Sequence, residues 1–152
     1  MRKFFSMLAV VFAIAALSTG VAVGAPGGTD RPLQVSGSAV NTVDFVNGTF
    51  VGEGAAQITH LGRSTIHIDG VLTGPTTSAF TTTVVAANGD TLTTSGTGAL
   101  TGPNTFTNLQ TITGGTGSFA GATGAFTDTG TFALDPSNRS TITFTSTGTI
   151  SY

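Results

Sequence analysis

The sequence predicts an all-β fold, an eight-stranded antiparallel up-and-down β-barrel, and the prediction rests on three observations. Hydrophobic residues make up 39% of the 152 residues and charged residues only 8%, a composition that favours a folded core over disorder. The 31 threonines and 22 glycines lie in short segments that alternate apolar and polar residues, as strands do. Beyond the N-terminal 24 residues, no segment has helical periodicity over the length of a helix.

Eight segments show the two-residue alternation, and turn residues separate them. They lie near residues 34 to 40, 47 to 60, 63 to 72, 79 to 87, 91 to 100, 106 to 113, 125 to 134 and 140 to 151. Pro75, Pro103 and Pro136 fall between segments, where no hydrogen bond of a strand ladder is lost. Short connections favour a meander, and closing it removes the exposed edges. A β-sandwich is the alternative, because strand counting does not separate the two architectures.

The last segment shows the alternation most clearly. One of its faces consists of threonines, namely Thr141, Thr143, Thr145, Thr147 and Thr149. We expect this face to contact solvent. Such a ladder, with a repeat of about 6.8 Å along a strand, is also a pattern for binding ice or polysaccharide. Ice binding requires a flat array, and the twist and tilt of barrel strands disfavour one.

Between two Thr-rich segments lies a corner of eleven residues that is rich in glycine. Its glycines are Gly114, Gly115, Gly117, Gly121 and Gly124, which we predict to be structural. A glycine is required where the backbone turns sharply or passes close to another strand, because it has no Cβ. The run Gly-Gly-Thr-Gly-Ser-Phe-Ala-Gly-Ala-Thr-Gly resembles the corner seen in dirigent proteins and in bacterial relatives of the allene oxide cyclase barrel.

This resemblance implies an eight-stranded barrel that holds small apolar or phenolic molecules, with cyclase- or dirigent-like activity as one possible function. The plant cyclases use acidic, amide and cysteine side chains in the lumen, and this chain has no cysteine. Dirigent proteins use charged residues and an aromatic hydroxyl, whereas the only tyrosine here is the last residue, Tyr152. No catalytic residue therefore carries over from the resemblance.

The corner also matches the dinucleotide-binding pattern G-x-G-x-x-A from Gly115 to Ala120, with Asp135 twenty residues after Gly115. That pattern requires a helix whose N-terminus faces the pyrophosphate. Gly121 and Gly124 interrupt a helix here, and strand-like alternation resumes at Ala125. We therefore reject nucleotide binding and predict no cofactor.

The N-terminus has the pattern of a secretion signal. Arg2 and Lys3 precede an apolar run from Met7 to Leu17, and small residues follow. The apolar run is too short to span a bilayer. We expect residues 1–24 to be a signal peptide, residues 25–32 a flexible leader, and residues 33–152 the barrel domain. The protein is then secreted or extracellular, or periplasmic, and the resemblance to the barrel family implies a bacterial member.

Charge and cysteine content exclude several partners. After removal of the signal peptide, three arginines and seven acidic residues remain, a formal charge of −4 with no lysine. Nucleic acid and anionic membranes are therefore unfavourable partners, because both are bound through basic residues. Without cysteine there is no disulfide and no thiol nucleophile. Asn47 and Asn138 match the glycosylation pattern, and both also read as turn residues.

The hairpin that bears both histidines is the candidate binding region. With Leu61 and Gly62 as a two-residue turn, His60 faces Arg63, and Ala56 faces His67. That register places two polar and two aliphatic side chains on the lumen face, our candidate ligand-binding residues: Glu53, Gln57, Ile66 and Ile68. His60, His67 and Asp69 then share the outer face, where a metal site is a further alternative to ordinary surface charge.

The sequence thus predicts a secreted, non-catalytic β-barrel that binds a small apolar or phenolic molecule in its lumen. Two histidines on one hairpin and the lack of a Gly-x-Ser-x-Gly elbow give little support for a catalytic triad. A structural or surface-exposed extracellular protein without a ligand is the main alternative. The sequence does not determine the oligomeric state.

Overall fold

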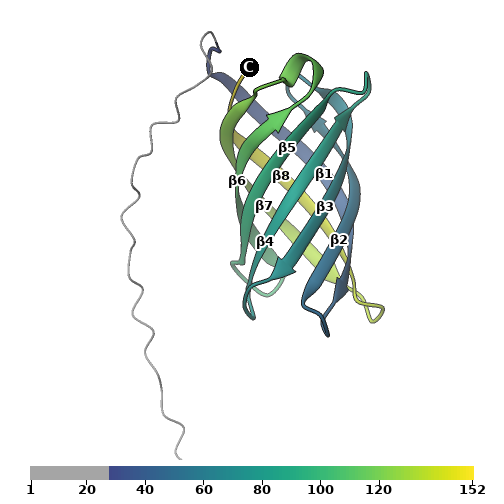
Figure 1. Ribbon diagram of the computed structural model, residues 1–152. Helices are drawn as coiled ribbons and strands as arrows, with labels where there is room; N and C mark the ends of the chain where they lie inside the picture. Colours follow the sequence, from purple (N-terminus) through teal and green to yellow (C-terminus); the bar gives the residue numbers. More distant parts are fainter. Residues whose placement is uncertain (1–27) are drawn as a thin grey trace, which may run out of the picture.

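The computed structural model describes residues 28–152, so the predicted signal peptide lies outside the described residues. Consecutive antiparallel strands close into a barrel in which β1 pairs with both β2 and β8 (Figure 1). The strands are β1 (Arg31–Asp44), β2 (Thr49–Ile58), β3 (Gly62–Leu72), β4 (Thr77–Ala86), β5 (Thr91–Leu100), β6 (Thr105–Gly115), β7 (Thr123–Leu134) and β8 (Arg139–Ser151). The predicted up-and-down barrel is confirmed, and the β-sandwich alternative is wrong.

Strand β1 is longer than its sequence pattern indicates. It begins at Arg31, opposite Ile150 of β8, and so includes the last two residues of the expected leader. Pro32 lies opposite Thr149 within this pairing. The partner strand comes from the other end of the chain, and for this reason no local pattern marks the start of β1.

The two ends of the barrel differ in their connections. At one end, the lower end in Figure 1, four loops of equal length join the strands: 45–48, 73–76, 101–104 and 135–138. Pro75, Pro103 and Pro136 lie in three of these loops, as predicted. At the other end lie the loops 59–61 and 87–90, the glycine-rich corner and the C-terminus.

Four phenylalanine rings fill much of the lumen, and each lies over a glycine of the neighbouring strand. The pairs are Phe50 and Gly70, Phe80 and Gly96, Phe106 and Gly130, and Phe144 and Gly37. A Cβ on any of these glycines would collide with the ring. An eight-stranded barrel is only just wide enough for its interior side chains, so a large residue needs a small one opposite.

The glycine-rich corner closes the upper end of the barrel. It contains a short 3-10 helix, Gly117–Phe119, whose Phe119 is only 4% exposed and packs edge-to-face on Tyr152. Gly117 and Gly121 have φ values of +60° and +73°, which side-chain-bearing residues rarely adopt. The backbone N–H of Ser118 donates to Asp90 in the loop between β4 and β5, at 3.1 Å. Strand β7 then begins at Thr123, and no α-helix follows the corner.

We expect Gly96→Ala to lower the free energy of unfolding by about 1–3 kcal/mol, the usual effect of overpacking a core. The added Cβ would lie 2.7 Å from Cζ of Phe80. Combining it with Phe80→Leu, which removes that contact, should cost less than the two single effects together. Thr143→Val on the exposed wall is the control and should change stability by about 0.5 kcal/mol or less. Urea denaturation measures all four variants, and strictly additive losses would contradict the ring-over-glycine packing.

Candidate functional site

The lumen opens at the lower end into a cavity of about 280 Å³. Its wall is mainly aromatic and aliphatic, and its phenylalanines are Phe45, Phe50, Phe80, Phe106 and Phe132. All but Phe45 belong to strands, so regular backbone positions them. An apolar cavity of 150 Å³ already accommodates benzene in another protein, so this one has room for a substituted ring.

Two amide side chains are the main polar groups of this cavity. Asn41 of β1 lies opposite Gly52, and its Oδ1 is buried without a hydrogen-bond partner among the described residues. Asn108 of β6 lies opposite Gly98, where the missing Cβ leaves space for its Oδ1. A buried polar atom without a partner costs about 1–3 kcal/mol. The Oδ1 has almost no accessible surface and lies against Gly52, so a ligand in the cavity recovers that free energy only if the amide turns its oxygen toward it.

Asp128 lies in the lumen just above these amides and is only 2% exposed. Its Oδ2 accepts from Gln110 Nε2 at 2.6 Å and from Asn108 Nδ2 at 3.2 Å, and its Oδ1 accepts from Ser146 Oγ at 2.6 Å. Thr94 Oγ1 in turn donates to Gln110 at 2.5 Å. These bonds fix the orientation of Asn108, since its Nδ2 is held on the carboxylate.

Burial raises the pKa of Asp128, and the hydrogen bonds from Ser146, Gln110 and Asn108 oppose this shift. All three donors are neutral, so no cation compensates a charge on this carboxylate. A second cavity of about 50 Å³ lies around Asp128, Gln110 and Ser146. It shares wall residues with the larger cavity, among them Ile68 and Asn108.

The register that we predicted between β2 and β3 is wrong. Glu53 pairs with His67 and Gln57 with Arg63, because three residues, 59–61, connect the strands instead of two. His60 adopts a left-handed φ of +73° in this loop. An odd shift in register exchanges the two faces of one strand relative to the other.

The candidate ligand-binding residues are therefore divided between the two sides of the barrel wall. Ile66 and Ile68 are buried in the lumen, with exposures of 4% and 7%. Glu53 and Gln57 are exposed on the outer surface, contrary to the face that we expected for them. They do not line either cavity.

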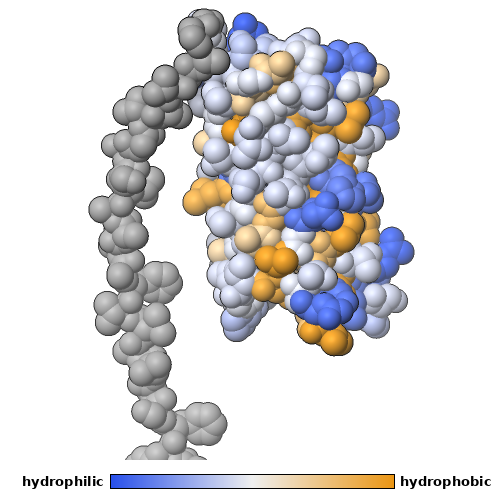
Figure 2. Space-filling view, in the orientation of Figure 1, coloured by the Kyte–Doolittle hydropathy of each residue, from blue (hydrophilic) through white to orange (hydrophobic). Residues whose placement is uncertain are grey.

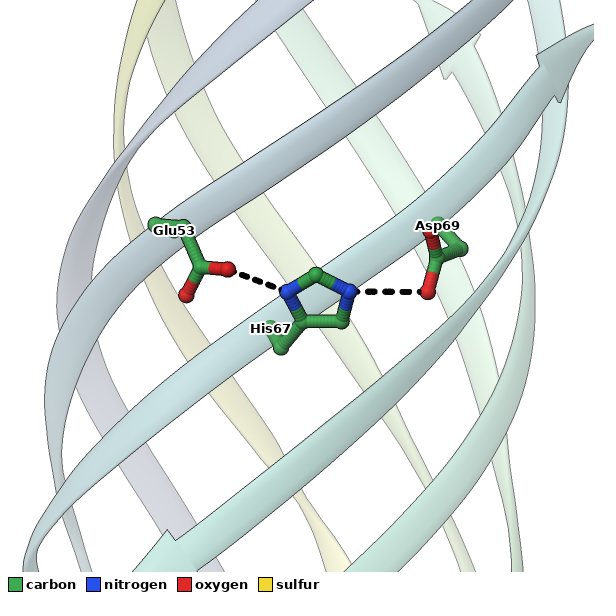
Figure 3. A network of polar contacts seen from close by, with 3 residues as sticks. All are labelled: Glu53, His67 and Asp69. Carbon is green, nitrogen blue, oxygen red and sulfur yellow. Dashed lines mark hydrogen bonds and ion pairs between the residues drawn. The ribbon is translucent and has the colours of Figure 1, made fainter.

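On the outer surface, His67 lies between two carboxylates, as Figure 3 shows. Its Nδ1 contacts Glu53, and its Nε2 lies 2.9 Å from Oδ2 of Asp69. The hydrogen bond with Glu53 is the main cause that raises the pKa of His67, and the charges of Glu53 and Asp69 add to it. This arrangement favours an imidazolium that donates from both ring nitrogens.

The metal-site alternative combined residues that lie apart. His60 lies in the loop between β2 and β3, where its Nε2 is 2.9 Å from the carbonyl of Pro32. His67 is in the middle of β3. Among residues 28–152, no group of three His, Asp or Glu side chains is arranged to hold a metal ion.

Outside the cluster on β2 and β3, hydroxyl groups dominate the wall of the barrel. Thr143, Thr145 and Thr147 of β8 lie directly opposite Thr131, Thr129 and Thr127 of β7. Figure 2 shows much of the visible surface at intermediate hydropathy. Eight strands close a full turn, so neighbouring strands face directions that differ by about 45°. This curvature disfavours the flat array that ice binding needs.

No family model matches the sequence, and no curated protein matches it either. Among solved structures, a pterocarpan synthase dirigent protein, GePTS1, is similar with a TM-score of 0.47 and 15% identity. The match covers 82% of this chain and 85% of that chain. At this level of similarity neither an activity nor the role of a residue carries over. In the part of the chain that the structure describes, no helix is long and apolar enough to cross a membrane.

The sequence analysis did not identify the polar residues of the lumen. Asn108 and Gln110 alternate with Phe106 and Ile112 on one face of β6. The sequence could have identified them, because a polar residue at a position of the apolar face of a strand is unusual. Asp128 of β7 follows Phe126 by two residues and shows the same signal.

We expect the stability of the wild-type protein to fall, relative to Asp128→Asn, as pH rises above about 4. A carboxyl with a raised native pKa contributes stability below its unfolded pKa of about 3.9 and loses it as pH rises through the native value. Asparagine keeps the shape and remains neutral. Urea denaturation between pH 4 and 8 measures the difference, and a difference that does not vary with pH would contradict the assignment.

We expect Glu53→Gln to lower the pKa of His67, because the bond with Glu53 is the largest cause of its shift. Asp69→Asn, the matched control, should lower that pKa by less. Titration of the imidazole carbon-bound protons by NMR measures both variants. If Asp69→Asn lowered the pKa of His67 more than Glu53→Gln does, Asp69 and not Glu53 would be the main cause of the shift.

Proposed function

We propose that the mature protein is a secreted, non-catalytic β-barrel that binds a small apolar molecule bearing a hydroxyl or N–H group in its lower cavity. The N-terminal pattern of residues 1–24 supports secretion. The observation that supports binding most directly is the buried Oδ1 of Asn41, which has no partner among the described residues and belongs to the wall of a mainly apolar cavity. Ligand sites commonly combine an apolar wall with a few polar groups that orient the ligand.

The position of the histidines supports binding without turnover. Both histidines of the chain lie outside the lumen, His60 in a loop and His67 on the outer wall. General acid–base catalysis requires a titratable group within hydrogen-bond reach of the reacting proton. Among the buried polar residues of the described chain, Asp128 is the one with a carboxyl group. Both of its oxygens accept hydrogen bonds from neighbouring side chains.

A comparison of para-cresol with para-xylene tests the proposal, because the two differ by a hydroxyl in place of a methyl group. We expect the wild-type protein to bind para-cresol more tightly by about 1 kcal/mol or more, since the hydroxyl donates to Asn41. In Asn41→Leu this preference should disappear, because leucine has a similar size but no acceptor. Isothermal titration calorimetry and thermal shift measure the affinities.

Thr143→Val on the outer wall is the control and should retain the preference for para-cresol. Unliganded Asn41→Leu should be as stable as the wild type or more stable, because it loses a buried unpaired group. Failure of both compounds, and of larger phenols, to bind would favour the structural protein without a ligand. A cresol preference that persists in Asn41→Leu would show that Asn41 is not the acceptor.

A further inference from the structure

We propose that the ligand is a single-chain amphiphile that enters the barrel polar end first and leaves its apolar chain on the rim of the mouth. The rim is defined by four side chains at the lower end: Phe45, Leu72, Leu100 and Leu134. This inference rests on the proposed function and adds the class and orientation of the ligand.

The rim residues both line the cavity and contact solvent. Phe45, Leu72, Leu100 and Leu134 are 55%, 38%, 44% and 49% exposed, and all four belong to the cavity wall. They come from the loop after β1 and from the last residues of β3, β5 and β7. Apolar side chains therefore extend from the cavity to the outside of the mouth, beside polar wall residues such as Thr76 and Ser78.

Polarity increases with depth below the rim. Phe45, the first residue of the loop after β1, follows Asn41 by four residues, a distance of about 13 Å along an extended chain and on the order of 10 Å along the barrel axis. On β5 and β6, Leu100 lies opposite Phe106, and Gly98 opposite Asn108, one inward-facing row deeper. An amphiphile matches this order only when its polar group lies deepest and its chain extends outward.

The size of the rim disfavours a second copy of the chain as its occupant. The four partly exposed side chains present on the order of 300–400 Å² of apolar surface. A stable dimer buries about 800 Å² on each partner. A ligand chain requires only a narrow apolar path, and the rim adjoins the cavity that holds the remainder of the ligand.

The charges beside the mouth disfavour an anionic lipid surface. Asp44 and Asp135 at two of the lower loops outnumber Arg139, which begins β8 at the same end. Each carboxylate accepts hydrogen bonds from its own loop, for example from the backbone N–H groups of Asn47 and Ser137. Their negative charges would repel anionic headgroups. A neutral ligand chain meets no such repulsion.

A series of para-alkylphenols with ethyl, butyl, hexyl, octyl and decyl chains tests the inference by isothermal titration calorimetry below their aggregation concentrations. In the wild type we expect the affinity to rise through the octyl and decyl members, by about twofold to fourfold for each added methylene that the rim covers. In the double variant Leu100→Ser with Leu134→Ser, this rise should stop at the chain that fills the cavity.

Leu109→Ser is the matched control, because Leu109 is 61% exposed on the outer wall of β6, away from the mouth. It should bind the whole series as the wild type does. If the ethyl and butyl compounds bind and longer chains add nothing, the rim inference is overturned while the cavity proposal stands. If no member binds, both are overturned. Self-association, or binding to phosphatidylcholine vesicles, that the double variant loses and Leu109→Ser keeps would assign the rim to that partner instead and overturn the inference.

Discussion

The narrow lumen of an eight-stranded barrel is the constraint on which the rest of this structure depends. Every second strand pair, β2/β3, β4/β5, β6/β7 and β8/β1, meets it by placing a phenylalanine ring over a glycine. The ring replaces the side chain that glycine lacks, so the glycine costs the strand less than it would at an unpacked position. Asn41 over Gly52 and Asn108 over Gly98 use the same arrangement for amides. The space beside each glycine thus determines where rings and polar groups lie in the lumen.

The polar network around Asp128 lies deeper in the lumen than the mouth, in the wall of the smaller cavity. The smaller cavity, of only about 50 Å³, has this network in its wall together with large apolar side chains such as Leu92 and Phe144. Below it, the larger cavity is open to solvent at the mouth. A buried carboxylate without a cation is unfavourable unless its oxygens are satisfied, and Gln110, Asn108 and Ser146 satisfy them. Of this network, Asn108 also lines the lower cavity.

Much of this architecture follows from local sequence patterns, and the exceptions have physical reasons. The alternation of apolar and polar residues placed all eight strands, and proline positions placed three of the four lower loops. The predicted β2–β3 register was wrong because the loop has three residues, 59–61, and His60 in it adopts a left-handed φ. A glycine usually marks such a position in a sequence, and residues 59–61 include none. The start of β1 depends on its pairing with β8, which lies at the other end of the sequence. Asn41 and Asn108 line the same cavity because the barrel closes, and no local pattern in the sequence shows this.

The unpaired amide of Asn41 is not what a lumen built only for stability requires. If this lumen served stability alone, a leucine in place of Asn41 would fill the same space without a buried acceptor, and such a replacement is neutral or favourable. The chain instead keeps an amide in the cavity wall and a glycine opposite that makes room for it. Under the proposed function, a molecule that enters from below meets apolar surface first and Asn41 last, so the hydrogen bond would form only after its polar end has passed the phenylalanine rings. Selectivity for a hydrogen-bond donor would then depend on depth of insertion, so the length and shape of a ligand would matter as much as its polar group.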